Sequence, residues 1–424
     1  MRKIDILYGR AVQTLEVPEP RLNGVLEPDH SELSGAGEVE LVMNALEHPM
    51  GTPRLCEMAR GKERILVITS DHTRPVPSRI TMPLLLREIR SGNPEAEIVI
   101  LIATGLHRAP TREEIWEKFG PEIAAQETIV VHRADADESM VDLGALPSGG
   151  RLRVNGWVGW AQLVLSEGFI EPHFFAGFSG GRKSILPGIA SKETVLYNHN
   201  AAFIRHPHAR QGVLEGNPIH RDMAFAAEAA GLAFILNVLI DADKRVIAAF
   251  AGDPVRAHGA GCSLCRRMTC VKAVEADIVV TSNGGYPLDQ NIYQAVKGMT
   301  AAEACVRAGG VIILCAALGD GHGGEAFYHW FADRPDVASV ARAIESIPAE
   351  QTTSDQWQAQ ILARVMQKAT VIFVTDGANR ALLEAMHMRW APDVNAALEQ
   401  AVQLVGANAD VTAIPDGVGV IVEG

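Results

Sequence analysis

The sequence lacks the long apolar segments, the abundant cysteine and the excess of positive charge that mark several classes of protein. No apolar run in its 424 residues approaches the roughly 20 residues that a membrane-spanning helix needs. Its formal net charge of −13 argues against a general binder of nucleic acid or of anionic membranes, although a local basic cluster can still bind a small anion. Six cysteines in this length are typical of a reducing compartment, so we expect a cytoplasmic protein.

The cysteines do not indicate a metal site. Three of them lie close to His258, but Asp253 and Pro254 predict a helix start there, with the aspartate as N-cap. One set of residues then recurs at helical spacing, as a packed face does: Val255, His258, Cys262, Cys265 and Met268. We therefore expect this helix, which Cys270 follows, to be packed and metal-free.

Short β-rich runs alternate with helical patterns along the chain, which predicts an α/β fold with parallel strands. Met1–Tyr8 reads as a strand with a charge inside it, not as a signal peptide. Further strands are expected at 64–69, 97–102, 128–131 and 161–166. A helix over 80–91 should connect the first two of these.

A second series of strands, at 277–281, 310–315 and 370–375, predicts a Rossmann-like unit. The loop Gly319–Gly324 is not a Gly-x-Gly-x-x-Gly motif that opens a helix, so we expect no nicotinamide site there. The length of the chain favours two domains. We expect largely parallel sheets in both, an N-terminal cofactor-binding domain over 1–270 with 406–424, a C-terminal domain over 271–405, and the active site in the cleft between them.

Polar residues collect just beyond the carboxyl ends of three predicted strands. The first loop holds Asp71, Thr73 and Arg74, which suggest a polar network that binds an anion. The second loop holds His107, and the third is the long segment Glu171–Ser184, which contains His173. Each residue alone could be an ordinary loop residue. Because ligands of open α/β sheets bind at the carboxyl ends of the strands, their clustering favours a functional site.

The segment Gly177–Ser184 invites comparison with a phosphate loop, Gly-x-x-x-x-Gly-Lys-Ser/Thr, but departs from it twice. Arg182 stands where the second glycine is required, and Pro187 prevents the helix that should follow the lysine. Consecutive glycines still leave backbone N–H groups open to a phosphate or carboxylate. We therefore expect a loop that binds an anion without hydrolysing a nucleoside triphosphate, through Ser179, Gly180 and Gly181.

Lys183, in this loop, could act as a covalent nucleophile if the loop is partly desolvated. His199 follows sixteen residues later. Neutral imidazole is a common ligand of late first-row metals. One histidine is a weak metal signal, however, because a classical zinc site has two or three ligands at helical spacing and none appears here.

A helix of the second unit begins near Asp289, which is a plausible N-cap. Gln294 and Lys297 are three residues apart and share a face, with Tyr293 one turn before the lysine. Lys297 could be a solvated surface residue, yet the segment 292–302 is nearly uncharged, which is unusual for a face exposed to water.

Taken together, these motifs resemble the nickel-pincer lactate racemase family over essentially the whole chain. The segments that carry the resemblance are Asp71-His-Thr-Arg-Pro75, Gly105-Leu-His-Arg108, Glu171–Ser184, Asn198-His-Asn200, Tyr293-Gln-Ala-Val-Lys297 and Asp355-Gln-Trp357. Their order and spacing across widely separated segments make the match specific.

The resemblance implies a cofactor. Family members carry a nickel-pincer nucleotide, pyridinium-3-thioamide-5-thiocarboxylic acid mononucleotide, attached to a lysine that matches Lys183. The Ni(II) ion takes two sulfurs and a carbon from this cofactor and a nitrogen from the histidine that matches His199. One protein histidine can therefore suffice. Asp71, Thr73 and the glycine loop would bind the cofactor, and cofactor-maturation enzymes would be partners of the chain.

The resemblance also implies a reaction, the interconversion of the enantiomers of a 2-hydroxy acid such as lactate. A hydride moves from the substrate to the pyridinium ring and returns to either face of a 2-keto acid. By resemblance, His107 and His173 are the two bases that exchange the hydroxyl proton. Arg74 and Lys297 would bind the substrate carboxylate. Gln294, Tyr293 and Trp357 would assist in the same pocket.

Several points stay open. The substrate could be a larger hydroxy acid, such as malate, 2-hydroxyglutarate or an aldonate, and the alternative of a different class is a non-catalytic phosphate- or anion-binding protein. His72 departs from the expected pattern and could contact substrate or cofactor. Arg205, His206 and His208 read better as a solvated loop than as substrate contacts. The oligomeric state cannot be inferred.

Overall fold

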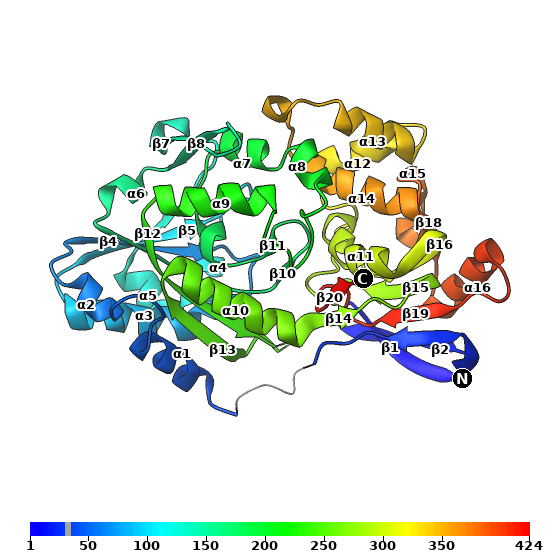
Figure 1. The fold of residues 1–424 in the computed structure, drawn as a ribbon, viewed down its shortest axis with the longest axis horizontal. Coiled ribbons are helices and arrows are strands. Elements are labelled where there is room, and N and C mark those ends of the chain that lie inside the picture. The colour runs from blue at the N-terminus through cyan, green and yellow to red at the C-terminus, as the bar shows by residue number, and fades with distance from the viewer. Residues whose placement is uncertain (30–34, 242) are drawn as a thin grey trace. The chain divides into compact units, whose positions relative to one another are not determined.

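The computed structural model describes residues 1–29, 35–241 and 243–424 (Figure 1). They form two compact units, which we name by their positions in the chain. The terminal unit comprises Met1–Asp29, Asn200–Arg205 and Arg267–Gly424, and the central unit comprises His30–His199 and His206–Arg266. None of the described helices is long and apolar enough to cross a membrane.

The main sheet of the central unit has the strand order β13, β12, β9, β4, β5, β6. Neighbouring strands are parallel except β13, which runs antiparallel to β12. Their bounds are β4 (Arg64–Ser70), β5 (Glu97–Ala103), β6 (Thr128–Val131), β9 (Leu163–Phe169), β12 (Leu232–Ile240) and β13 (Val246–Gly252). The four strands predicted between residues 64 and 166 are confirmed. Central strands of this kind are buried on both faces, which explains their continuous apolar runs.

Helices α1 (Glu38–Glu47), α2 (Leu55–Ala59) and α3 (Ser78–Gly92) pack with this sheet around a hydrophobic core, which Phe119 also joins. Val42, Leu55 and Leu85 of these helices and Ile65 of β4 are fully buried in it. Helix α3 confirms the connection predicted over 80–91.

The central unit contains further helices and strands, some of which flank the loops of the candidate site. They are α4 (Arg112–Phe119), α5 (Pro121–Gln126), α6 (Trp157–Trp160), α7 (Lys192–Asn198), α9 (Pro218–Ala229), α10 (Pro254–Thr269), and the strand pairs β7 (Met140–Ala145) with β8 (Arg151–Asn155) and β10 (Pro172–His173) with β11 (Gly177–Phe178).

Helix α10 is the packed helix that the cysteine pattern predicts. The Asp253 carboxylate accepts hydrogen bonds from the N–H groups of Val255 and Arg256, so Asp253 caps the helix as expected. Four of the five residues at helical spacing are buried, but Val255 is 77% exposed and does not belong to the packed face.

The main sheet of the terminal unit is entirely parallel, with the strand order β18, β17, β16, β15, β19, β3. The bounds are β3 (Leu22–Val25), β15 (Ala276–Ser282), β16 (Val306–Cys315), β17 (Thr370–Val374), β18 (Arg389–Ala391) and β19 (Val411–Ile414). The three strands predicted between residues 277 and 375 are confirmed as β15, β16 and β17.

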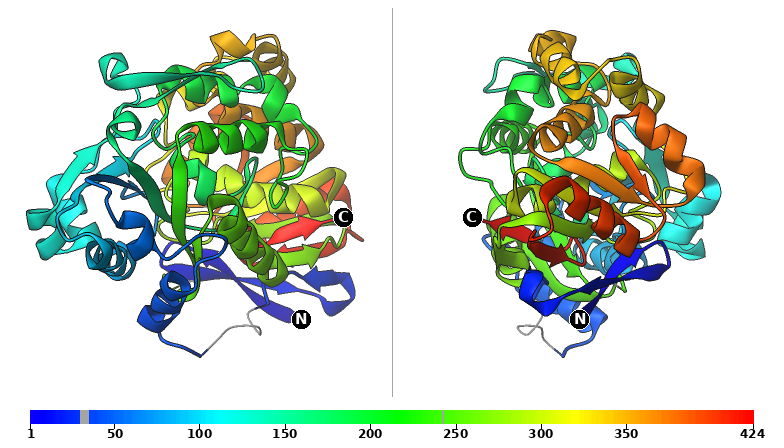
Figure 2. Two further views of the ribbon diagram at one scale, coloured as in Figure 1. Left: turned by 60° about the vertical axis from the view of Figure 1, so that its left-hand side comes forward. Right: turned by 90° about the vertical axis from the view of Figure 1, so that its right-hand side faces the viewer.

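Alternate residues of these strands point to opposite faces of the sheet. On one face, Ile278, Val280 and Ile313 share a core with the hairpin of β1 (Arg2–Tyr8) and β2 (Ala11–Val17) and with α16 (Val394–Val405), which lie side by side in Figure 2. Helices α11 (Ile292–Cys305) and α14 (Gln356–Lys368) pack on β15 and β16 without joining that core, so we place them on the other face.

Shorter elements complete the terminal unit. They are α8 (Ala201–Arg205), α12 (Glu325–Ala332), α13 (Val337–Glu345), α15 (Arg380–Ala385) and the parallel pair β14 (Cys270–Lys272) with β20 (Ile421–Glu423).

The division of the chain differs from the predicted domains at both ends. The predicted boundaries assign 1–29 and 406–424 to the N-terminal domain, but β19 pairs with β15, and β3 pairs with β19. Both segments therefore belong to the terminal unit. A strand's own pattern of apolar residues predicts that it is a strand but not which distant strand it pairs with, so the sequence could not decide this assignment.

The start of α11 also differs from the prediction. Asn291, not Asp289, caps this helix, because the Asn291 side chain accepts a hydrogen bond from the N–H of Gln294 at 2.9 Å. The Asp289 carboxylate instead accepts from the N–H groups of Gly9 and Ala317, at 2.6 and 3.0 Å. Both donors are distant in sequence, so local capping rules could not identify them.

Candidate active site

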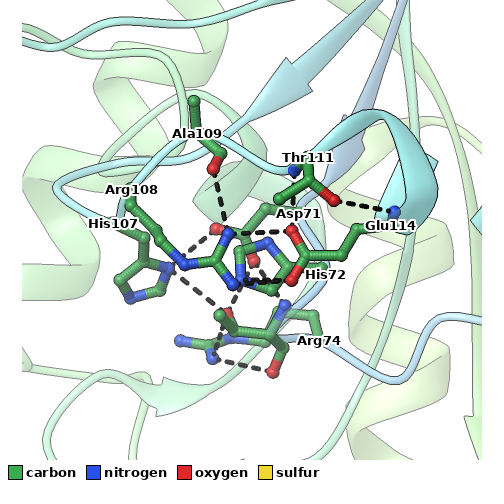
Figure 3. A network of polar contacts seen from close by, with 9 residues as sticks. Asp71, His72, Arg74, His107, Arg108, Ala109, Thr111 and Glu114 are labelled. Carbon is green, nitrogen blue, oxygen red and sulfur yellow. Dashed lines mark hydrogen bonds and ion pairs between the residues drawn. The ribbon is translucent and has the colours of Figure 1, made fainter.

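His107 and Asp71 form a hydrogen-bonded pair at the carboxyl ends of β5 and β4. Asp71 Oδ2 lies 2.8 Å from His107 Nδ1, and Asp71 is almost completely buried (Figure 3). Asp71 Oδ1 accepts hydrogen bonds from the N–H and the hydroxyl of Thr73, at 2.9 and 2.6 Å. Both carboxylate oxygens thus have protein partners, so Asp71 is placed to orient the histidine, and its predicted contact with a cofactor stays a prediction.

The charge of Asp71 suits this role. Burial raises the pKa of the Asp71 carboxyl, but the hydrogen bond and charge of His107, followed by Thr73 and Arg74, outweigh burial and hold the pKa at about 2. An ionised carboxylate at Nδ1 favours the tautomer of His107 that carries its lone pair on Nε2. The His107 side chain is 42% exposed, so Nε2 can exchange protons with a bound molecule.

Arg74 lies beside this pair. Its Nη1 donates hydrogen bonds to the carbonyl oxygen and the hydroxyl of Thr73, at 3.2 and 3.0 Å. Arg74 as a whole is half-buried. A guanidinium has five donors in a planar fork that matches a carboxylate, so Arg74 is suited to bind an acidic substrate.

The loop that carries His107 is held by Glu114 of α4, a residue that our sequence analysis did not single out. The Glu114 carboxylate accepts a forked pair from Arg108 at 2.8 and 2.6 Å and a bond from the N–H of Thr111 at 2.7 Å (Figure 3). The bond from Arg108 is the main reason why the pKa of Glu114 falls to about 2. The pattern Thr-x-x-Glu before a helix is a capping box, and it could have identified Glu114. His72 Nε2 lies 3.7 Å from the same carboxylate.

Three other predicted residues surround the buried ring of Phe175. The ring centroid of Phe175 is 4.6 Å from that of His173 and 5.0 Å from that of His199, and Lys183 Nζ lies 5.7 Å from it. His173 lies in β10, Lys183 in a 3₁₀ turn over Gly181–Ser184, and His199 directly after α7. The predicted base, tether and metal ligand therefore lie together. Phe175 itself was missed, although it follows His173 by only two residues.

His199 has the properties of a metal ligand. Burial, followed by the positive charge of Lys183, lowers the pKa of His199 to about 3, so the ring is neutral at physiological pH. Neutral imidazole is the form that binds metals. The backbone N–H of His199 donates to the carbonyl oxygens of Val195 and Leu196, at 3.0 and 3.1 Å, which fixes this residue at the end of α7.

A metal at His199 would need ligands from another molecule. Across residues 1–29, 35–241 and 243–424, no three or more His, Cys, Asp or Glu side chains form a metal-binding group by themselves. Lys183, next to His199, offers a point of attachment for an organic ligand. The two residues therefore fit a tethered metal cofactor.

Arg182 holds the loop of Lys183 from inside the protein. It is 4% exposed and donates to the carbonyl oxygens of Ala176 and Phe178, at 2.6 and 2.8 Å, and to His220 Nδ1 at 3.0 Å. The described segment after Lys183 contains no α-helix before α7. The prediction that this loop differs from a phosphate loop is confirmed, and Arg182 stands where a glycine would be required because its guanidinium fills the interior of the loop.

The prediction that this loop presents open N–H groups to an anion is wrong for two of its three residues. The N–H of Gly181 donates to Asn237 Oδ1 at 2.7 Å, and the N–H of Ser179 donates to the carbonyl oxygen of Glu171 at 2.9 Å. A side chain on Gly180 would meet Asn237 Oδ1 at 2.7 Å. The loop is thus packed on β12, a contact that the sequence does not reveal, and its glycines permit that packing.

The residues predicted to bind substrate from the second domain lie in the terminal unit. Tyr293, Gln294 and Lys297 are half-buried on the first turns of α11, and Trp357 is 8% exposed on the first turn of α14. Their contacts with a substrate stay predictions.

Of the three residues predicted to lie in a solvated loop, Arg205 is the last residue of helix α8, and His206 and His208 follow the helix. Arg205 is exposed and pairs with Glu345 at 3.5 Å. The rings of His206 and His208 lie 5.5 Å apart, and His208 is exposed.

Comparison with known proteins agrees with this geometry. Residues 8–212 match the lactate racemase N-terminal domain, and residues 271–422 match the lactate racemase C-terminal domain. The chain belongs to the lactate racemase family. The predicted resemblance, the α/β fold and the class of enzyme, an isomerase, are confirmed with it.

Relatives within the lactate racemase family are similar over their full length. The lactate racemase of Thermoanaerobacterium thermosaccharolyticum is 52% identical over 423 residues, which cover 100% of this chain and 99% of the relative. That of Lactiplantibacillus plantarum is 49% identical over 427 residues and is covered completely, as is this chain.

Solved structures extend the comparison to the fold. The apoprotein of the T. thermosaccharolyticum lactate racemase matches this fold with a TM-score of 0.97 over 100% of both chains. A Thermotoga maritima protein, 18% identical over 91% of this chain and 98% of its own, has a TM-score of 0.67 and shares the fold alone.

Proposed function

We propose that this chain is a lactate racemase, which interconverts the two enantiomers of lactate. The observation that carries the proposal is the cluster of His173, Lys183 and His199 around Phe175, in a chain 52% identical to a lactate racemase over its full length. The pair of Asp71 and His107 at the neighbouring strand ends supports it.

Lys183 and His199 are the residues that would hold a nickel-pincer nucleotide, Lys183 as the covalent tether and His199 as the nickel ligand. When bound, this group supplies an acceptor and donor for the hydride at C2 of the substrate. The half-buried Lys183 and the neutral ring of His199 support the assignment. Because the N–H of Gly181 is bonded to Asn237, we expect this loop to position Lys183 and other residues to bind the phosphate of the cofactor.

His107 and His173 act as the two bases. Loss of hydride from C2 requires that the substrate hydroxyl also lose its proton, and each enantiomer presents that hydroxyl differently. Nε2 of His107 takes or returns the proton for one enantiomer, while Asp71 stabilises the imidazolium that forms. His173, on the loop of the tether, does the same for the other. The guanidinium of Arg74 binds the substrate carboxylate, with Lys297, Gln294, Tyr293 and Trp357 as further proposed contacts.

The test is to produce the chain together with cofactor-maturation enzymes and to follow single enantiomers of lactate by chiral chromatography. We expect racemisation from either enantiomer, nickel in the protein and a mass increment on the peptide that contains Lys183. His199→Ala should lose nickel, whereas His107→Ala and His173→Ala should retain it without racemising lactate. Full activity of either base variant would contradict the two-base scheme, and an active enzyme without nickel would contradict the cofactor.

A panel of other acids tests the substrate. The same holoenzyme is offered single enantiomers of malate, phenyllactate, 2-hydroxyglutarate and gluconate. We expect lactate to have the highest kcat/KM. A holoenzyme that carries nickel but prefers a larger acid would retain the cofactor assignment and replace lactate as the substrate.

A further inference from the structure

Asp355 has an unusual backbone conformation at the start of α14. Its φ is 65°, in the left-handed region that few residues other than glycine, asparagine and aspartate adopt. Its carbonyl oxygen accepts hydrogen bonds from the N–H groups of Gln358 and Ala359, at 3.1 and 3.2 Å. Asp355 is therefore the N-cap residue of this helix, but a normal N-cap has an extended backbone.

The Asp355 carboxylate does not perform the usual task of an N-cap aspartate. Within the described part of the chain it makes no capping hydrogen bond to the N–H groups of α14. By contrast, the aspartates that precede α13 and α16, Asp336 and Asp393, do cap their helices in this way. Asp355 instead accepts a hydrogen bond from the side chain of Tyr293. The left-handed turn thus directs the carboxylate away from its own helix and toward α11.

Tyr293 is held on other sides as well. Its carbonyl oxygen accepts a hydrogen bond from the side chain of Gln358, and its N–H donates to the carbonyl oxygen of His322 at 3.1 Å. Its ring packs edge-on against Phe327, with the centroids 5.3 Å apart. The backbone and ring are therefore fixed, and the hydrogen bond to Asp355 fixes the remaining freedom, the direction of the hydroxyl.

We infer that Asp355 is a positioning residue: its carboxylate accepts the hydroxyl proton of Tyr293 and so fixes the direction in which the Tyr293 oxygen presents its lone pairs to the substrate. This rests on the proposed function, in which Tyr293 contacts a 2-hydroxy acid. Burial raises the pKa of Asp355, and the bond from Tyr293 opposes that shift, so the two groups stabilise each other. A bond to a carboxylate is stronger than one to a neutral acceptor, so the hydroxyl proton of Tyr293 stays on the side of Asp355 and the Tyr293 oxygen is an acceptor toward the substrate hydroxyl.

The test is a double-mutant cycle between Asp355→Gly and Tyr293→Phe in the holoenzyme. Glycine keeps the left-handed backbone and removes only the carboxylate. We expect Asp355→Gly to lower kcat/KM for lactate about tenfold, mainly through KM, when Tyr293 is present. In the Tyr293→Phe background, Asp355→Gly should lower kcat/KM for lactate less than twofold. Asp355→Asn, which tolerates this backbone and keeps a neutral acceptor, should restore most of the loss.

Asp336→Gly is the matched control, because it also removes an N-cap aspartate but lies on α13 without this contact. It should lower stability and leave KM unchanged. A second cycle, on the urea midpoint of the apoprotein, measures the same coupling without substrate. Equal losses of Asp355→Gly in both Tyr293 backgrounds would overturn the inference. If the urea midpoints of the apoprotein show coupling between Asp355 and Tyr293, but the holoenzyme racemises none of the acids, the contact between the two residues stands and only the proposed function is rejected.

Discussion

At the scale of single residues, the buried carboxylate of Asp71 decides how His107 can act. Asp71 directly follows β4, and the sequence predicts a strand at that place. Its role depends on His107, which belongs to another loop and comes within 2.8 Å only because β4 and β5 are neighbours. The sequence therefore predicts both residues as part of a site but not which one orients the other.

Replacing this carboxylate by an amide should impair catalysis without affecting nickel. In Asp71→Asn the side chain keeps its shape, but the charge that stabilises protonated His107 is lost. We expect kcat to fall by about 10²- to 10⁴-fold, the range that a positioned acid–base pair contributes. The measurement is the rate of racemisation and the nickel content of the holoenzyme. The control is Asp142→Asn, which removes the charge from an exposed carboxylate that pairs with Arg151 and accepts from the N–H of Gly144; equal rates in the two variants would refute the role of Asp71.

The same carboxylate should make stability depend on pH. The pKa of Asp71 is lowered in the fold, from an ordinary 3.8 to about 2, so its contribution is present in full above pH 3.8 and disappears as the pH falls through about 2. A shift of this size corresponds to about 2 kcal/mol. In urea unfolding at pH 6, we expect Asp71→Asn to be less stable than the wild type by about that amount, and the difference should shrink toward pH 2. A difference that stays constant with pH would contradict the ionised pair.

At the scale of elements, the loops that carry His107 and Lys183 are joined by their backbones. The N–H of Gly105 donates to the carbonyl oxygen of Gly188 at 2.9 Å. The apolar patterns predict the strands before these loops, because a buried strand needs a continuous apolar run. They do not predict the bond between the loops, since it joins two turns whose residues are far apart in sequence.

Gly188 should therefore be required for both loops. A Cβ at this position would lie 2.8 Å from the carbonyl oxygen of Lys183 and still closer to that of Ser184. We expect Gly188→Ala to shift this turn, to lower the melting temperature by several degrees for a cost of about 1–3 kcal/mol, and to reduce racemisation more than tenfold. Differential scanning calorimetry and the activity assay measure both effects. Gly159→Ala is the control, because nothing lies within 4 Å of its added methyl group; equal effects of the two changes would contradict a specific close contact.

At the scale of the whole molecule, the first residues of the chain belong to the core of its last part. Ile6, Leu15 and Val17 of the N-terminal hairpin are fully buried with residues of β15, β16 and α16. Our domain prediction assigns this hairpin, together with 406–424, to the N-terminal domain. In the structure, the hairpin packs with segments hundreds of residues away in the chain.

This arrangement predicts which elements lose stability when the hairpin is mutated. Leu15→Ala should destabilise the terminal unit by about 2–5 kcal/mol, the usual effect of a cavity left by a buried leucine. Hydrogen exchange followed by mass spectrometry should show faster exchange in α16 and β15 and unchanged exchange in β4 and β5. Val12→Ala, on the same strand but 47% exposed, is the control. Faster exchange in β4 after Leu15→Ala would contradict the division into units.

The sequence by itself determined the α/β class and seven of the twelve described strands in the two main sheets, and it proposed the site residues from Asp71 to Trp357, because apolar periodicity and short motifs are properties of neighbouring residues. It also identified the family, since the order and spacing of those motifs are specific. Only the tertiary structure decided that Asp71 is hydrogen-bonded to His107 and that His173, Lys183 and His199 lie around the ring of Phe175. It alone also decided that the glycine loop packs on β12. Each of these is a contact between distant segments, and local preferences contain no information about which distant partner a side chain meets.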